Sequence, residues 1–401
     1  MQHTDPETPE GNANDFALFR LGFRPFFLAG GIFSVIVMAI WMADLVAGMN
    51  IIPANTSPMF WHAHEMIYGY ALAIIAGFLL TAVKNWTGIQ TLHGTALKLL
   101  LLCWLLARIA ALIPGPNALL AAIVLDNVFI ALLAIALSVP VIRAKLWKNM
   151  AVISKVYFLL IGNIVYALGL LGIFADGQRI GIFIGLYMIL SLILVLSRRV
   201  IPMFIERGVG YQVSLQNHLW VDISGFLLFL AFAICDIFLA QPALTAWLAA
   251  TLFILHSIRL YGWHTHGIWK KPLLWVLYLA YAWIILGFGL KFAAFMVGIP
   301  SSLALHAFAV GGIGMMTLGM ISRVSLGHTG RNIMQPPSAL APIFCMLFVA
   351  AWIRVLFPLL FSGHYLLWIG LSQALWIAAF AWFVYIYAPI LIRPRLDGRW
   401  G

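Results

Sequence analysis

Two histidines and a glutamate stand close together in the segment Trp61-His62-Ala63-His64-Glu65-Met66. The segment opens a long apolar stretch that has no charged residue between Glu65 and Lys84. Ionisable side chains inside a membrane are costly, and they usually mark a functional site. Because imidazole is a common ligand of metal ions and of haem iron, the cluster predicts a metal or haem site within a membrane protein.

A third histidine, His306, lies in the outer third of another apolar segment. Successive residues of a regular helix are about 100° apart, so His62 and His64 point about 200° apart and cannot both reach one ion. His62 would share a helix face with Glu65, and His64 with Tyr68. One histidine could meet His306 across a haem while the other serves a second metal or a hydrogen bond. Alternatively, the first turn is irregular and both bind one ion.

Glu65 and Tyr68 are the candidate catalytic residues. Glu65 could carry protons, ligate a metal or fix the tautomer of a neighbouring histidine. The residues after it lack the second histidine of the HExxH motif, which argues against a zinc protease. The alternative to a metal site is a pair of buried, hydrogen-bonded histidines that brace two helices.

A second candidate region is the basic segment of residues 323–331, in which Arg323 and Arg331 flank His328. Arginines at a helix end could bind haem propionates or lipid phosphate. The predicted cofactor-binding residues are therefore His64, His306, His328, Arg323 and Arg331, and the predicted metal ligands are His62, His64 and His306.

The elements that must position these residues are transmembrane helices. The chain has 401 residues, of which 64% are hydrophobic and only 9% charged, whereas soluble domains carry about 25% charged residues. A bilayer-spanning helix needs about 20 apolar residues. The sequence predicts an all-α polytopic membrane protein with twelve spans, at 25–48, 59–83, 95–113, 118–142, 151–174, 180–204, 218–240, 243–262, 272–297, 301–324, 338–361 and 365–391.

The net charge of +11 does not indicate a nucleic-acid partner, because the basic residues follow the membrane topology. With the N-terminus inside, only Arg108, Arg179, Lys291 and Arg354 fall outside the cytoplasmic segments. This is the positive-inside pattern. It predicts a protein of the bacterial inner membrane, surrounded by the lipid bilayer, with both termini cytoplasmic.

The expected organisation is a single membrane domain, residues 20–395, between two short cytoplasmic tails. Residues 1–19 are polar and lack the apolar core of a signal peptide, and residues 396–401 form the other tail. The three cysteines are scattered singly, so no disulfide framework is expected.

An internal repeat relates the second and tenth spans. Five residues recur with numbers that differ by 242, and both segments run from a histidine to a Thr-Gly pair. The pairs are His64 and His306, Gly69 and Gly311, Gly77 and Gly319, Thr87 and Thr329, and Gly88 and Gly330. The spacing suggests three four-helix units, the plan of haem–copper oxidase main subunits, in which histidines of the second and tenth helices hold haem. This similarity is one of layout only.

The motifs also resemble those of a known family, NnrS, over about residues 16 to 395. The matching segments are residues 21–27, 61–66, 77–82, 85–88, 281–283, 306–307 and 323–331. The resemblance implies a bacterial inner-membrane protein of twelve helices that contains haem and copper and is linked to denitrification and nitric oxide tolerance. It places the family histidines at His62, His64, His306 and His328. It does not supply a reaction.

Three functions remain open from the sequence. The first is a haem b protein, with copper as a further metal, that binds or reduces nitric oxide or another small gas, with quinol or a cytochrome as electron donor if turnover occurs. It would protect against nitrosative stress or support denitrification. The second is a proton- or metal-coupled transporter. The third is a factor that delivers haem or copper to another enzyme.

Overall fold

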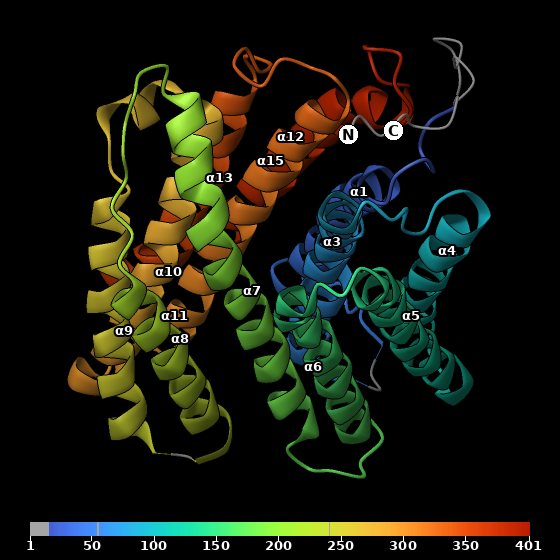
Figure 1. The fold of residues 1–401 in the computed structure, drawn as a ribbon. Helices are drawn as coiled ribbons and strands as arrows, with labels where there is room; N and C mark the ends of the chain where they lie inside the picture. The colour runs from blue at the N-terminus through green and yellow to red at the C-terminus, as the bar shows by residue number, and fades with distance from the viewer. Residues whose placement is uncertain (1–15, 54–55, 240) are drawn as a thin grey trace.

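The computed structural model describes residues 16–53, 56–239 and 241–401, and in this part of the chain every regular element is a helix (Figure 1). Eleven helices are long and apolar enough to cross a membrane. A twelfth, α4 (Gly94–Ala110), has 17 residues. The prediction of an all-α polytopic membrane protein is confirmed. The predicted N-terminal tail of residues 1–19 lies mostly outside the described residues.

Twelve spans follow one another up and down through the bundle. In chain order they are α1 (Phe23–Leu45); α2 (Pro58–His64), η1 (Glu65–Ala71) and α3 (Leu72–Thr87); α4; α5 (Pro116–Arg143); α6 (Trp147–Leu170); α7 (Gly177–Gly208); α8 (Leu219–Ile234) with η2 (Cys235–Leu239); α9 (Pro242–Gly262); α10 (Pro272–Val297); α11 (Ser302–His306), η4 (Ala307–Gly314) and α12 (Met315–His328); α13 (Leu340–Val355) with α14 (Phe357–Leu360); and α15 (Tyr365–Ile392). Short 3₁₀ turns, η3 (His266–Lys270) and η5 (Ser362–His364), precede α10 and α15.

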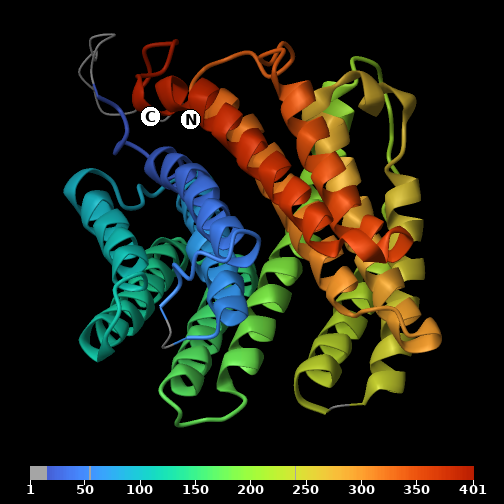
Figure 2. The same cartoon turned by 180° about the vertical axis from the view of Figure 1, so that it is seen from behind.

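The bundle has two ends, which we call the terminal end and the far end. The terminal end is where α1 begins and α15 ends, and there the backbone N–H of Ala17 donates to the carbonyl of Ile392 at 2.8 Å. α1 packs along α15 and so closes the ring of helices (Figure 2). Apart from the four exceptions named above, the basic residues of the described chain lie in the terminal halves of their helices or in connections at that end.

The second, sixth and tenth spans meet inside the ring. α7, the sixth span, lies at the middle of the molecule and contacts both η1 and η4, while α3 contacts α12 (Figure 1). The remaining spans connect them around the outside. The arrangement agrees with three four-helix units, each of which contributes one inner span.

The predicted repeat is present in three dimensions. η1 and η4 are π-helical turns that begin directly after His64 and His306. Gly88 and Gly330, just beyond the two spans, both have positive φ, at 71° and 74°. Because L side chains rarely adopt this conformation, glycine is favoured at both positions.

The first helix of each unit also corresponds. A side chain at Gly69 would meet Phe33 of α1, and one at Gly311 would meet Trp283 of α10. Residue numbers of α1 and α10 differ by 250 at this contact. The close approach of helices through small residues is typical of membrane proteins, and here it is conserved between the first and third units.

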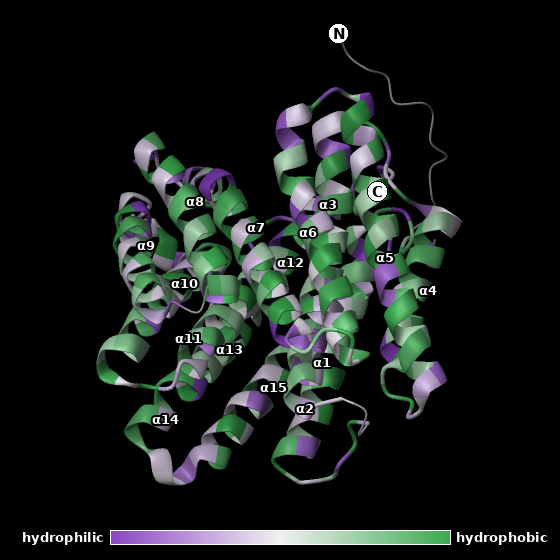
Figure 3. Ribbon diagram, turned by 90° about the horizontal axis from the view of Figure 1, so that it is seen from below, coloured by the Kyte–Doolittle hydropathy of each residue, from purple (hydrophilic) through white to green (hydrophobic). Residues whose placement is uncertain are grey.

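The helices consist mostly of hydrophobic residues, as Figure 3 shows from the far end, and many of these residues are exposed. Large aliphatic side chains project from several spans, among them Leu102, Leu132, Ile161, Leu227 and Ile254, each more than 40% exposed. An apolar surface of this extent is typical of contact with lipid.

Candidate functional site

Both histidine-bearing spans change their helical winding where the candidate residues lie. The extra residue of a π-helical turn rotates the following side chains relative to an α-helix, and such turns often occur at functional sites. The 100° rule therefore fails after His64. The expectation that Glu65 shares a face with His62 is wrong: the Glu65 carboxylate lies beside the imidazole of His64, 3.0 Å from its Nδ1.

His64 and Glu65 belong to a buried ionic cluster at the far end of the first unit. Arg108 donates from Nη1 to both carboxylate oxygens of Glu65 at 2.8 Å, and its Nη2 pairs with Asp126 of α5. Arg108 and Asp126 therefore form an ion pair between adjacent helices. Since Glu65 is only 1% exposed and the other two are nearly as buried, the three charges depend on one another for compensation.

Both ring nitrogens of His64 face oxygen acceptors. Nε2 lies 2.8 Å from Oδ1 of Asn163, and the amide of Asn163 is oriented by its own bond to Asn127. Nδ1 faces Glu65 on the other side of the ring. An imidazole satisfies two acceptors at once only when both nitrogens carry hydrogen. A metal role for His64 stays a prediction, and it would require one of these bonds to be released.

Tyr68 packs against His64, with ring centroids 5.1 Å apart, so the predicted shared face is confirmed. Its hydroxyl donates to the carbonyl of Gly181 in α7 at 2.6 Å, and the side chain is fully buried. This contact ties the second span to the sixth. The catalytic role predicted for Tyr68 stays a prediction.

A cavity of about 50 Å³ adjoins the cluster. His64, Glu65, Arg108 and Asp126 line it, together with the indole of Trp61, whose buried Nε1 has no hydrogen-bond partner within the described chain. A polar cavity of this size has room for a few water molecules. The first unit therefore holds a buried ionic site beside a cavity large enough for water.

The third unit holds a different cluster at the same depth. His306, at the start of η4, donates from Nδ1 to the carbonyl of Ser302 at 2.7 Å. Its Nε2 accepts a hydrogen bond from Nη2 of Arg354 in α13 at 3.1 Å. These two bonds define a neutral imidazole with its lone pair on Nε2.

His62 belongs to this second cluster and not to that of His64. Its ring stacks on Trp41 of α1, with centroids 4.7 Å apart and planes 7° apart. Arg354 lies near enough to both His62 and His306 for its charge to act on each. The Nδ1 atom of His62 is buried and has no hydrogen-bond partner among the described residues.

The third candidate region, around His328, lies at the terminal end. The His328 ring packs against Phe23, with centroids 5.6 Å apart, and the described chain offers its ring nitrogens no hydrogen bond. Arg395 donates to its backbone carbonyl at 2.9 Å. Arg323 stacks on the ring of Phe204 at 3.9 Å.

Other arginines at this end are already engaged. Arg24, which is completely buried, donates to the carbonyls of Leu391 and Arg393, at 2.7 and 2.8 Å, and to that of Gly401 at 2.6 Å. Arg331 is half-buried in the same region, and its burial and then the neighbouring Arg393 lower its pKa. The cofactor-binding role predicted for Arg323 and Arg331 stays a prediction.

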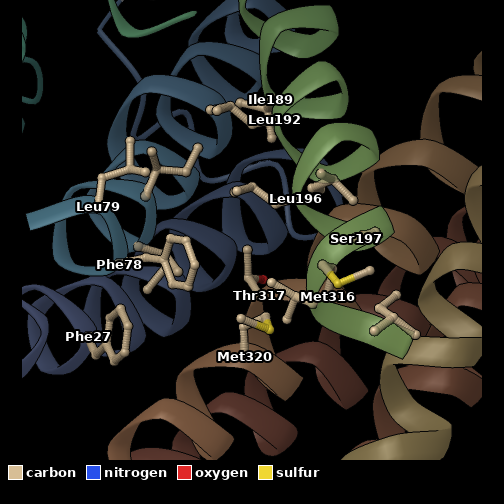
Figure 4. Close-up of a pocket in the computed structure, with 15 residues that line it drawn as sticks. Phe27, Phe78, Leu79, Ile189, Leu192, Leu196, Ser197, Met316, Thr317 and Met320 are labelled. Atoms are coloured by element: carbon tan, nitrogen blue, oxygen red, sulfur yellow. The ribbon is translucent and has the colours of Figure 1, made fainter. Parts of the chain in front are cut away.

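An apolar cavity of about 80 Å³ lies between the inner spans, closer to the terminal end. Figure 4 shows Phe27, Phe78, Leu192, Met316 and Met320 around it. The hydroxyl of Thr317 donates to the backbone carbonyl of Ile313, so it does not present a free donor to this space. Apolar cavities of this kind stay dry and accept small apolar molecules.

The structure thus divides the predicted site residues into three places. His64, Glu65 and Tyr68 lie in the first cluster, His62 and His306 in the second, and His328 with the basic segment at the terminal end. Within residues 16–53, 56–239 and 241–401, no three His, Cys, Asp or Glu side chains are grouped as they would be around a metal ion.

Sequence reasoning missed the partners of these histidines, above all Arg354, Asn163 and Trp41. For Arg354 a signal was present. Arg108 follows His64 by 44 residues and Arg354 follows His306 by 48, so the repeat itself relates the two arginines. No comparable signal pointed to Asn163 or Trp41.

The fold and these clusters define a class: a polytopic membrane protein with histidine-containing polar sites inside its helix bundle. A family model described as NnrS protein matches residues 17–395, nearly the whole chain, and the chain therefore belongs to the NnrS family. No curated protein matches it.

Proposed function

We propose that this chain is an intramembrane haem protein, with copper as a second metal, that binds nitric oxide or another small gaseous ligand. The observation that carries the proposal is that His62 and His306 lie in one cluster. They come from two spans that the repeat relates, and both lie near Arg354. Metal-binding histidines usually donate their second ring N–H to a backbone carbonyl. His306 does so to Ser302, which leaves Nε2 as the nitrogen whose lone pair would bind a metal once its hydrogen bond from Arg354 is released.

Each end of the bundle has side chains with the donor atoms that copper or haem requires. At the far end, His62 and His306 are suited to a copper ion or to haem iron, because imidazole binds both. At the terminal end, His328 offers a ring without hydrogen-bond partners, and Arg323 and Arg331 offer cations for carboxylates such as haem propionates. When bound, either metal would supply an open coordination position for the gas.

The protein's own contribution is to hold the gas in an apolar environment. Nitric oxide is small and apolar, and the cavity between the inner spans is lined almost wholly by aliphatic, aromatic and thioether groups. Binding alone needs no electron donor. Reduction would draw electrons from quinol or a cytochrome, and Glu65 stays the candidate for proton delivery.

The proposed location is the bacterial inner membrane, with the terminal end in the cytoplasm. The concentration of basic residues at that end supports this orientation by the positive-inside rule.

The test is an optical spectrum of the detergent-purified protein, oxidised, reduced, and reduced with nitric oxide, together with metal analysis. We expect a haem spectrum that shifts with nitric oxide and a copper content that falls in His62→Gln and His306→Gln. His364→Gln, which changes an exposed histidine of η5, is the matched control and should keep the metal content of the unmodified protein. Full metal content and an unchanged nitric oxide shift in both site variants would overturn the ligand assignment.

A transporter is the second candidate, and the buried ionic cluster of the first unit favours it. Arg108, Glu65 and Asp126 lie beside a polar cavity, which is the arrangement expected on a proton or ion pathway. A purified protein with neither haem nor copper would make this the leading account.

A further inference from the structure

Arg354 is a buried cation for which the described chain provides no anion. The residue is 9% exposed. Its Nη2 donates to the neutral His306 ring, and the phenol of Tyr365 lies near it. Its Nη1 is buried without a hydrogen-bond partner in the described part of the protein. The carboxylates that the structure describes form no ion pair with it.

Two other basic groups of the far end do not share this condition. Lys291 pairs with Asp236 at 2.6 Å, and Arg108 is held between two carboxylates. The nearest acid of α1, one turn beyond Trp41, is Asp44, and its carboxylate instead accepts the backbone N–H groups of Ile51 and Ile52. A charge taken out of water without a partner is strongly destabilising. An anion bound near Arg354 would therefore stabilise the folded protein.

The repeat shows what is missing at this site. Glu65 directly follows His64 at the start of η1, whereas Ala307 directly follows His306 at the start of η4. The third unit therefore retains the histidine and the arginine of the first but replaces the carboxylate by a methyl group. The position of the lost carboxylate is where a free anion would compensate Arg354.

The geometry points to a small inorganic anion bound beside Arg354, His306 and His62, and we propose this as an anion site of the protein. The unpartnered Nη1 of Arg354 and the unpartnered Nδ1 of His62 are available to it. Both imidazoles keep part of their surface accessible, whereas the two unpartnered nitrogen atoms are themselves buried. Water would satisfy the hydrogen bonds but would leave the charge uncompensated.

The anion expected is small and monovalent, because a single cation is to be balanced. Nitrite, nitrate and chloride share this chemistry. The inference does not depend on a bound metal. Where His62 and His306 also hold a metal ion, the anion would offset the additional positive charge, since guanidinium and metal would otherwise repel each other.

The test uses metal-free protein in detergent, with gluconate as the bulky buffer anion, and measures thermal unfolding as nitrite, nitrate or chloride is added. We expect a saturable rise in the unfolding temperature with at least one of the three. Arg354→Gln should weaken the apparent affinity at least tenfold, and Arg354→Lys, which keeps the charge, should retain binding. Arg179→Gln is the matched control, because Arg179 also lies at the far end but donates only to the carbonyl of Ile237.

The absence of a saturable rise in the unmodified protein, or an equal rise in Arg354→Gln, would overturn the proposal. If Arg354→Gln does not yield a monodisperse protein, Ala307→Glu, which supplies an internal carboxylate, gives the same test against the uncharged Ala307→Gln. Because no metal is present, failure here is distinguishable from failure of the proposed haem and copper function.

Discussion

The clusters around Arg108 and Arg354 occupy corresponding places in the first and third units, but the buried guanidinium group has different partners in each. In the first, Glu65 and Asp126 neutralise Arg108 within the protein. In the third, Arg354 contacts a histidine and a tyrosine, neither of which is an anion. A repeat can therefore preserve a fold although its copies differ in charge balance. In one copy protein carboxylates neutralise the buried arginine, and in the other the buried arginine has no described protein anion.

The largest expected difference is in the stability of variants that remove each arginine. Arg108→Gln leaves two buried carboxylates unpaired and should cost about 3–5 kcal/mol of unfolding free energy. Arg354→Gln removes a buried cation that has no internal anion, so it should not lower the free energy of unfolding. Denaturant unfolding in detergent, followed by tryptophan fluorescence, measures both. Equal losses would mean that Arg354 is compensated internally after all, and the contrast between the units would be lost.

A second prediction sharpens the comparison by restoring the missing carboxylate. Ala307→Glu should place a carboxylate near Arg354, as Glu65 lies near Arg108, and should reduce the affinity for the small anion at least tenfold, or about 1.4 kcal/mol. The measurement is the anion-dependent shift in unfolding temperature of metal-free protein.

The matched control is Ala307→Gln, which adds the same volume at a completely buried position without the charge. It should lose stability from overpacking but keep the anion effect. An undiminished anion effect in Ala307→Glu would show that a carboxylate at residue 307 does not reach Arg354 as Glu65 reaches Arg108.

The third prediction concerns the glycines through which the inner spans pack. An added Cβ would lie 2.6 Å from Phe33 at Gly69 and 2.3 Å from Trp283 at Gly311. Gly69→Ala and Gly311→Ala should therefore each cost about 1–3 kcal/mol, measured by the same unfolding assay. Gly363→Ala, where the added methyl meets nothing within 4 Å, should be nearly neutral. A neutral result at only one of the two inner glycines would show that the repeat does not extend to this packing contact.

The smallest effect is expected for the exposed ion pair at the terminal end. Hydrogen bonds from Arg395 lower the pKa of Asp397 to about 2, below its ordinary value of 3.8. Because the folded pKa is the lower one, the stabilisation is present above about pH 4 and is lost as the pH falls towards 2. Asp397→Asn should cost less than about 1 kcal/mol at neutral pH.

The measurement for this pair is hydrogen exchange at the Leu396 amide, which donates to the carbonyl of Thr329. Protection should fall slightly in Asp397→Asn and, in the unmodified protein, on acidification below pH 4. A large loss of global stability from this variant would contradict the distinction between exposed and buried ion pairs.

Much of the fold follows from the sequence, because each span must satisfy its backbone hydrogen bonds internally and present about 20 apolar residues to lipid. The twelve spans, their alternation and the repeat between the second and tenth are therefore predictable. The short α4 was also found, since its apolar run continues beyond the helix.

The site was less predictable, because its geometry depends on two π-helical turns that residue spacing does not reveal. The regular-helix rule placed Glu65 with His62, whereas η1 brings it to His64. The partners Asn163, Trp41 and Arg354 come from other spans, and which helices neighbour one another is decided by packing across the ring. The repeat of arginines after the two histidines is the one long-range signal that the sequence does contain.

The bonds of Arg24 have a consequence for how the protein is made. Arg24 lies in the first turn of α1, but its acceptors Leu391, Arg393 and Gly401 are synthesised at least 367 residues later. Chains fold from the N-terminus as they are synthesised, so this guanidinium has none of these partners until α15 has been inserted. Closing the helix ring by α15 is therefore required before the charge of Arg24 is solvated by the protein, and a chain truncated before residue 390 would leave that buried charge without its acceptors.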